Sequence, residues 1–274
     1  MSARKAARFG RGVAAAGALL LAGWASGVEG LSFDVGVGAV SVESTRFQDV
    51  KAADATDLPV LYGGPARFTD GQYDRGAELR LGVGYRPLPR LRAGLELAVA
   101  PGVDFSGNAN YLRSGDEQPS TAELSIRRLL VTATWDVFSW RFGGAGPPSR
   151  LYVGGGYGAT DYRLTDFVQR FPALRQGPSG EVALTALPSG SDREATFTLT
   201  TGVAIPLKGP WELDLAYRYT DGGDVETDLG DIDIVRYRAD GTRRNLAIPI
   251  DRTAGEYRSH TFSATLRWRY ETAP

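Results

Sequence analysis

Nine residues decide the fold: Trp211-Glu212-Leu213-Asp214-Leu215-Ala216-Tyr217-Arg218-Tyr219. Apolar side chains occupy every odd position, and charged or small side chains occupy every even position. Successive side chains of a β-strand point to opposite faces, so this stretch predicts a strand with one uncharged face and one charged face. The same period recurs along the chain and indicates the class of the protein.

Seven further stretches repeat this period of two, each with an apolar face that carries no charge. They are residues 31–39, 77–86, 91–99, 128–137, 150–159, 194–205 and 262–270. Runs of about 9 to 12 residues have the length that a tilted strand needs to cross a hydrocarbon layer. A soluble sandwich and a membrane barrel each cover one apolar face per strand, so alternation alone leaves both architectures open.

The connections between the runs separate the two architectures. Short turns, such as Arg86–Arg90 and Pro206–Pro210, alternate with much longer segments. Outer-membrane barrels have this pattern, with short periplasmic turns and long extracellular loops. The sequence therefore predicts an all-β protein, an eight-stranded antiparallel up-and-down transmembrane β-barrel. The four long extracellular loops are expected at about 44–75, 101–127, 160–193 and 221–256.

The N-terminal segment predicts export. Basic residues within the first twelve positions precede an apolar run over 13–25, and the small residues Ser26 and Gly27 follow. This order is typical of a cleaved secretory signal, and the run is shorter than the roughly 20 residues of a spanning helix. We expect a signal peptide at 1–27, an outer-membrane barrel domain at 28–274, and location in the outer membrane of a Gram-negative bacterium.

Aromatic residues gather at the short-turn ends of the predicted strands. Tryptophan and tyrosine favour membrane interfaces, because the ring is apolar while its N–H or O–H stays hydrated. An interface aromatic belt is therefore predicted at the periplasmic end. Its members are Trp135, Trp140, Trp211, Trp268 and Tyr270.

The polar faces of the predicted strands carry acids and arginines in nearly equal number. An eight-stranded barrel is only wide enough to be filled by its own side chains, and an unpaired buried charge is very costly. We therefore expect a lumen charge network that plugs the barrel with salt bridges, and a charge-lined selective pore is the alternative. The network residues are Glu78, Arg80, Arg92, Glu96, Arg128, Asp136, Glu212, Asp214, Arg218 and Arg267.

Residues suited to catalysis or metal binding are scarce. The chain has no cysteine and one histidine, which excludes ordinary zinc sites. We interpret His260, which falls on the lipid-facing parity near the extracellular rim, as an interfacial residue. No Gly-rich phosphate loop precedes a helix, so no catalytic, cofactor or metal site is expected, and the protein is predicted not to be an enzyme. The net charge of −1 argues against a nucleic-acid partner.

The last long segment contains a hairpin pattern. Residues 232–238 and 243–250 flank Asp240-Gly241, a dipeptide typical of a tight turn. If these segments crossed the membrane, the barrel would have ten strands. Arginines on both parities of the hairpin favour a protruding position outside the membrane instead.

Three stretches carry a family resemblance: Glu212–Tyr219, the Gly-rich Leu151–Gly158, and the closing strand that ends Leu266-Arg267-Trp268-Arg269-Tyr270. They resemble small outer-membrane barrels of the OmpA transmembrane-domain, OmpX and opacity-protein type. The resemblance implies that the closing strand is read by the barrel-assembly machinery during biogenesis.

These features predict a non-enzymatic surface protein, in which a barrel scaffold displays long loops for membrane integrity, adhesion or host interaction. A narrow porin-like channel for small solutes is the alternative, and a lipid A-modifying outer-membrane enzyme is the third hypothesis. The expected partners are outer-membrane lipid and lipopolysaccharide, the assembly machinery and an extracellular ligand of the loops.

Overall fold

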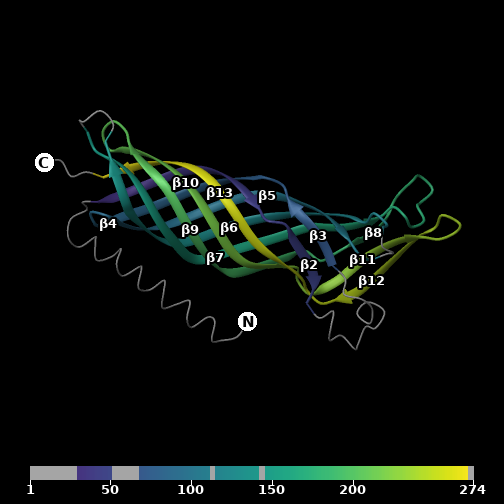
Figure 1. The fold of residues 1–274 in the computed structure, drawn as a ribbon. Coiled ribbons are helices and arrows are strands. Elements are labelled where there is room, and N and C mark those ends of the chain that lie inside the picture. The colour runs from purple at the N-terminus through teal and green to yellow at the C-terminus, as the bar shows by residue number, and fades with distance from the viewer. Residues whose placement is uncertain (1–29, 51–67, 112–114, 142–145, 271–274) are drawn as a thin grey trace.

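The computed structural model describes residues 30–50, 68–111, 115–141 and 146–270 (Figure 1). Their regular structure is β-strand throughout. None of these residues belongs to a helix with the length and apolar character needed to cross a bilayer. The predicted signal peptide at 1–27 lies outside the described residues, as does the part of the first predicted loop between 51 and 67.

Eight antiparallel strands close into a barrel. Each ring strand pairs with the next, and β1 pairs with β13 from Ser32–Arg269 to Val42–Ser259, which closes the ring. The predicted eight-stranded barrel is confirmed, because each of the eight alternating runs lies on its own ring strand. In ring order the strands are β1 (Leu31–Val42), β4 (Gly76–Leu88), β5 (Leu91–Ala109), β6 (Pro119–Trp140), β7 (Ser149–Phe171), β9 (Gly190–Pro206), β10 (Trp211–Glu226) and β13 (Thr253–Arg269).

The short connections lie at one end of the barrel, which we call the turn end. Residues 89–90 join β4 to β5, and residues 207–210 join β9 to β10. Gly209 in the second turn has a φ of 69°, a conformation that glycine adopts without steric cost. The first residues of β1 and the last of β13 lie at the same end, because Ser32 pairs with Arg269.

The barrel wall next to the turn end is apolar outside and charged inside. Leu81, Leu97 and Leu215 point outward and are 42–47% exposed, although they are large apolar residues. Their chain neighbours Arg80 and Asp214 point inward and are buried. We call the uncharged outward residues of the eight alternating runs the lipid-facing wall. A closed ring of strands offers these residues no second sheet to pack against, so hydrocarbon is the medium that suits them.

Farther from the turn end the pattern inverts. Phe105, Leu124 and Leu164 point inward and are buried, whereas Glu123 and Arg163 are exposed on the outside. An apolar interior with a charged exterior is the arrangement of a protein in water. We call this part the tower. It comprises β2 (Thr45–Asp49), β3 (Phe68–Tyr73), β8 (Ala183–Ala186), β11 (Gly230–Tyr237), β12 (Arg243–Ile250) and the adjoining ends of the ring strands.

The segments predicted as loops, about 44–75, 101–127, 160–193 and 221–256, are loops only in part. Much of their described length continues the ring strands or forms the short tower strands. An uncharged outward face defines the predicted strands, so they end where the outward residues become charged. The ring strands continue into water because their inward residues become apolar there and form a second core.

That second core is aromatic at its centre. Phe47, Phe105 and Phe167 are each 1% exposed and pack edge to face, with ring centroids 5.1 to 6.1 Å apart. Tyr73 packs against Phe105, and burial raises the pKa of its phenol well above the ordinary value. These residues come from β2, β3, β5 and β7, so the core ties the short strands to the ring.

The hairpin predicted in the last long segment consists of β11 and β12. Its strands pair from Gly230–Ile250 to Tyr237–Arg243, and β11 pairs with β8 rather than with a ring strand. At the tip the Thr242 N–H donates to the Asp240 carboxylate at 2.9 Å, which lowers the pKa of Asp240 below its ordinary value. Figure 1 shows the hairpin beyond the end of the barrel, so the protruding arrangement is confirmed and the ten-stranded one was wrong.

Candidate functional site

Arg267 is the centre of an ion-pair network in the lumen near the turn end. Its guanidinium donates to Asp34 at 2.8 Å, to Asp214 at 2.9 Å and to Glu212. Arg92 approaches Asp214 from another strand at 3.7 Å. Glu212 and Asp214 share one face of β10 because they are two residues apart, and Glu212 lies opposite Arg267 in the β10–β13 register. Neighbouring strands thus bring opposite charges together inside the barrel.

The network continues around the barrel through Glu212. Arg150 of β7 donates to Glu212, and its Nε lies 3.2 Å from the Asp136 carboxylate of β6. Arg86 of β4 reaches the same Asp136 carboxylate at 2.9 Å. Acids and arginines therefore alternate across strands from both sides of the lumen. Such alternation satisfies each buried charge with a partner of opposite sign.

A second cluster of charges lies farther from the turn end. Glu78 accepts hydrogen bonds from Arg80 at 2.6 Å and from Arg128 at 3.2 Å. Arg218 forms two hydrogen bonds with Glu96, one of them 2.8 Å long. The side chains of Glu78 and Arg128 are almost wholly buried, so these contacts occupy the middle of the lumen.

A small cavity separates the two charge clusters. Its volume is about 50 Å³, and its lining includes Asp34, Arg80, Glu96 and Arg267. A cavity of this size has room for a few water molecules but not for a larger solute. The turn-end network, the second cluster and the tower core follow one another along the barrel interior. Apart from this cavity, side chains occupy the described part of the lumen.

The residues predicted for the lumen charge network all lie inside the barrel, and each contacts a residue of opposite charge. Asp34, Arg86 and Arg150, which the polar faces of the predicted strands also contain, join the same network. Sequence reasoning missed Tyr152, whose hydroxyl donates to Asp214 at 2.6 Å. Gly202 lies opposite Tyr152 in the register, and a Cβ there would come within 2.5 Å of the tyrosine hydroxyl. A glycine opposite an inward tyrosine is the signal that could have identified this contact.

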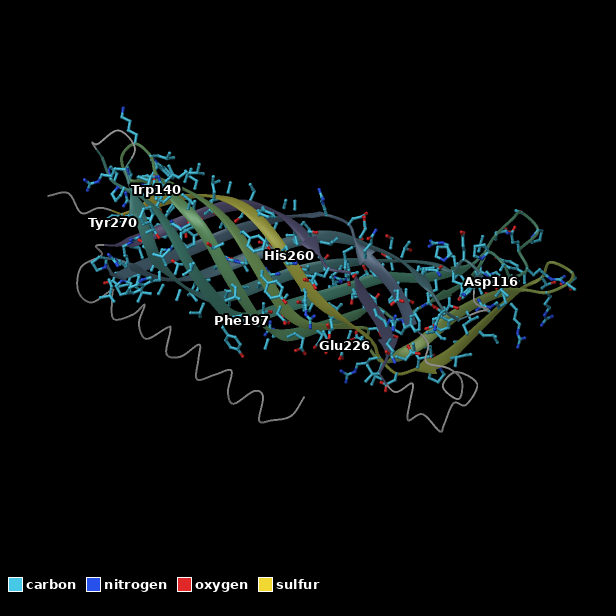
Figure 2. All side chains as sticks on the ribbon, in the orientation of Figure 1. Asp116, Trp140, Phe197, Glu226, His260 and Tyr270 are labelled. Atoms are coloured by element: carbon cyan, nitrogen blue, oxygen red, sulfur yellow. The ribbon has the colours of Figure 1, made fainter. Side chains whose placement is uncertain are left out.

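The aromatic residues predicted for the interface belt lie near the turn end. Trp211 pairs with Trp268 in the β10–β13 register, and Trp135 lies near the end of β6. Figure 2 shows Trp140 and Tyr270 at the same end of the barrel, far from Asp116 on the tower. The structure therefore brings these residues to the turn end of the barrel, where an interface would surround the strand ends.

His260 has partners that sequence reasoning missed. Its Nδ1 lies 2.7 Å from the Tyr217 hydroxyl, and its Nε2 lies 2.9 Å from a carboxylate oxygen of Glu43. Figure 2 shows His260 between the turn end and the tower, and it points outward from β13. Glu43 lies beyond the first alternating run, so strand parity could not connect the two. Nowhere in the described chain do three His, Asp or Glu side chains approach closely enough to hold a metal ion.

A family model described as "Outer membrane protein beta-barrel domain" matches residues 12–270. The chain belongs to this family. Outer-membrane barrels commonly have short periplasmic turns and longer extracellular loops. We therefore propose that the turn end of this outer-membrane barrel faces the periplasm and that the tower is extracellular.

Solved structures of outer-membrane barrels are similar to this family member at low sequence identity. Neisserial surface protein A is 16% identical, with 88% of this chain and 100% of that chain covered and a TM-score of 0.41. The protease OmpT from Escherichia coli is 9% identical, with 88% of this chain and 97% of that chain covered and a TM-score of 0.48. OprG from Pseudomonas aeruginosa is 12% identical, with 89% of this chain and 97% of that chain covered and a TM-score of 0.46. No curated protein matches the chain. The likeness concerns the fold and carries no information on activity.

Proposed function

We propose that this outer-membrane protein is a non-enzymatic, sealed scaffold that holds its tower at the cell surface for membrane integrity, adhesion or host interaction. The observation that carries the proposal is the filling of the barrel interior at successive levels. Buried ion pairs such as Arg267–Asp214 occupy the membrane level, and the core around Phe105 occupies the tower. A barrel filled in this way supports a rigid display surface better than it supports passage of solutes.

The outer surface of the tower suits contact with water and with soluble partners. Exposed ion pairs join neighbouring segments there, with Arg46 2.6 Å from Asp70 and Arg252 2.8 Å from Glu226. Such exposed pairs contribute little stability, since water screens them. Binding residues are commonly found on segments positioned by a rigid scaffold. The β11–β12 hairpin, which projects beyond the barrel, is the part of the tower best placed to meet a partner.

A narrow channel is the second candidate, and single-channel recording in planar lipid bilayers separates the two. We expect no steady current from the full-length protein, because ion-paired side chains occupy the lumen and leave only a cavity of about 50 Å³. Arg92→Gln, inside the lumen, and Arg193→Gln, on the tower exterior, form a matched pair. A steady current whose ion selectivity changes with Arg92→Gln but not with Arg193→Gln would replace the scaffold with a channel.

A further inference from the structure

A pocket of about 160 Å³ lies at the mouth of the lumen, on the turn-end side of the ion-pair network. Tyr270, which Figure 2 labels at this end of the barrel, is part of its lining. Four arginines also line it, and no acidic residue belongs to the described lining. We call it the arginine pocket, and its charged and hydroxyl members besides Tyr270 are Ser32, Arg86, Arg92, Arg267 and Arg269.

Neighbouring ring strands bring these side chains together. Arg269 and Arg267 share the inward face of β13 because they are two residues apart, and Arg269 lies opposite Ser32 of β1. On its other side Ser32 lies opposite Gly84 of β4, where a Cβ would come within 2.8 Å of the Ser32 Oγ. The glycine therefore leaves the space beside this hydroxyl open. Arg86 comes from the end of β4.

Several donors around the arginine pocket have no acceptor among the described residues. Ser32 is 4% exposed, and neither its Oγ nor the buried Nε of Arg269 has a hydrogen-bond partner there. Arg92 lies 3.7 Å from its ion-pair partner Asp214, which is longer than a hydrogen bond. Buried polar groups are nearly always satisfied in folded proteins, so these donors indicate an acceptor that the described side chains do not supply.

The charge of the pocket identifies the kind of acceptor. Arg86 and Arg267 already hold Asp136 and Asp34, so they add positive potential, while Arg92 and Arg269 are free to donate. Guanidinium groups form strong, directed hydrogen bonds with phosphate oxygens. A phosphate group carries about −1.5 to −2 charges and at least three acceptor oxygens. A carboxylate has one charge and two oxygens, so it would satisfy fewer of the converging donors.

The position of the pocket indicates where its ligand comes from. Arg267, whose side chain is 3% exposed, forms the floor, and Arg86, 24% exposed, lies nearer the mouth. The arginine side chains point into the ring, so a lipid in the surrounding bilayer does not reach them. The pocket is about three times as large as the cavity between the two charge clusters. It therefore has room for a small anion that arrives from water.

We propose that the arginine pocket binds the phosphate group of a water-soluble molecule, either inorganic phosphate or a small phosphomonoester. Arg92, Arg269 and Ser32 donate to its oxygens, and Arg86 and Arg267 stabilise its charge. With the turn end in the periplasm, the ligand is periplasmic. It enters and leaves by the same mouth, because the ion pairs of Arg267 close the floor. The inference goes beyond the scaffold function and holds for a sealed barrel.

Isothermal titration calorimetry of the full-length protein in an uncharged detergent tests the site. The probes are inorganic phosphate, glycerol 3-phosphate and acetate, at an ionic strength held constant with sodium chloride. We expect saturable binding of one phosphate group and no saturable binding of acetate. Saturation by inorganic phosphate assigns the free ion as a ligand, and saturation by glycerol 3-phosphate alone assigns the ester.

Two substitutions examine the donors. Arg269→Gln and Arg92→Gln are each expected to weaken phosphate binding at least about tenfold, a loss of about 1.4 kcal/mol. The matched control is Arg193→Gln, which removes the same charge from the tower exterior, where the side chain is 68% exposed, and should leave the affinity unchanged. Absence of saturable binding, acetate binding as tight as phosphate binding, or an equal loss with Arg193→Gln would overturn the proposal.

Urea unfolding separates a binding role of Arg269 from a purely structural one. A ligand that binds the folded state raises its stability, so phosphate should raise the urea midpoint of the wild type but not that of Arg269→Gln. Arg269 has no acidic partner among the described residues, so the substitution should not lower the midpoint in phosphate-free buffer. A lower midpoint without phosphate, together with an unchanged response to phosphate, would make Arg269 a structural residue and contradict the proposal.

Discussion

Glu212→Gln is expected to lower the free energy of unfolding of the barrel by about 3–5 kcal/mol, the usual cost of removing one partner from a buried ion pair. The Glu212 side chain is 0% exposed and accepts hydrogen bonds from Arg150 and Arg267. The amide keeps the shape but not the charge, so two buried guanidinium groups lose part of their compensation. Urea unfolding in lipid vesicles, followed by tryptophan fluorescence, measures the effect.

Glu256→Gln is the matched control for that experiment. Glu256 is also paired with an arginine, Arg258 at 3.0 Å, but its side chain is 67% exposed on the outside of β13. Exposed pairs of this kind contribute about 0–1 kcal/mol. Equal losses for the two substitutions would mean that the charges in the lumen are hydrated, and that the barrel is open to water.

Phe105→Ala is expected to cost about 3–5 kcal/mol, the usual penalty for truncating a buried phenylalanine. Phe105 is 1% exposed and packs against Phe47, Phe167 and Tyr73 in the tower core. The loss of stability should affect the tower and not the membrane-spanning part, because the apolar core of the tower is separate from the ion pairs of the membrane level. Limited proteolysis of the protein in vesicles should therefore cut the tower strands, while the barrel keeps its heat-modifiable migration on gels.

Phe197→Ala serves as the comparison for this second substitution. Phe197 is 47% exposed on the lipid-facing wall and is labelled there in Figure 2, so its truncation leaves no protein cavity. We expect its proteolysis pattern to match that of the wild type. A Phe105→Ala protein that remains as resistant as the wild type would contradict a packed tower core.

The barrel wall could be predicted from sequence because one simple pattern governs it. Lipid excludes charge from the outward face, so residues such as Leu215 alternate with inward ones such as Asp214 throughout the run. The short turns then fix the up-and-down order of the strands. The same alternation predicts which charged side chains point into the lumen, and the predicted network residues do lie there.

The tower could not be predicted in the same way, because the outward residues become charged there and, in β5, strand parity is also broken. In β5 the register with β6 shifts between Ala100 and Val103, at a bulge where Gly102 has a φ of 63°. The inward residues are even-numbered before the bulge and odd-numbered after it, as with Phe105. A bulge inserts one extra residue, so an alternation search that keeps one parity ends there.

Individual partners within the sites were also beyond sequence reasoning. Parity places Arg267 in the lumen, but only the register of three strands shows that it meets Asp34, Glu212 and Asp214 together. The contact between His260 and Glu43 likewise depends on the pairing of β1 with β13, whose ends are far apart in the chain.

Fluorescence quenching at three leucine positions measures whether the lipid-facing wall touches hydrocarbon. The chain has no cysteine, so single cysteines at Leu81, Leu97 and Leu215 can each carry a small fluorophore, with Ser106 on the outside of the tower as the control. In vesicles whose lipids have brominated acyl chains, we predict strong quenching at the three leucine positions and none at Ser106. Unquenched fluorophores at the leucine positions would show that this face does not touch hydrocarbon, and would contradict the account.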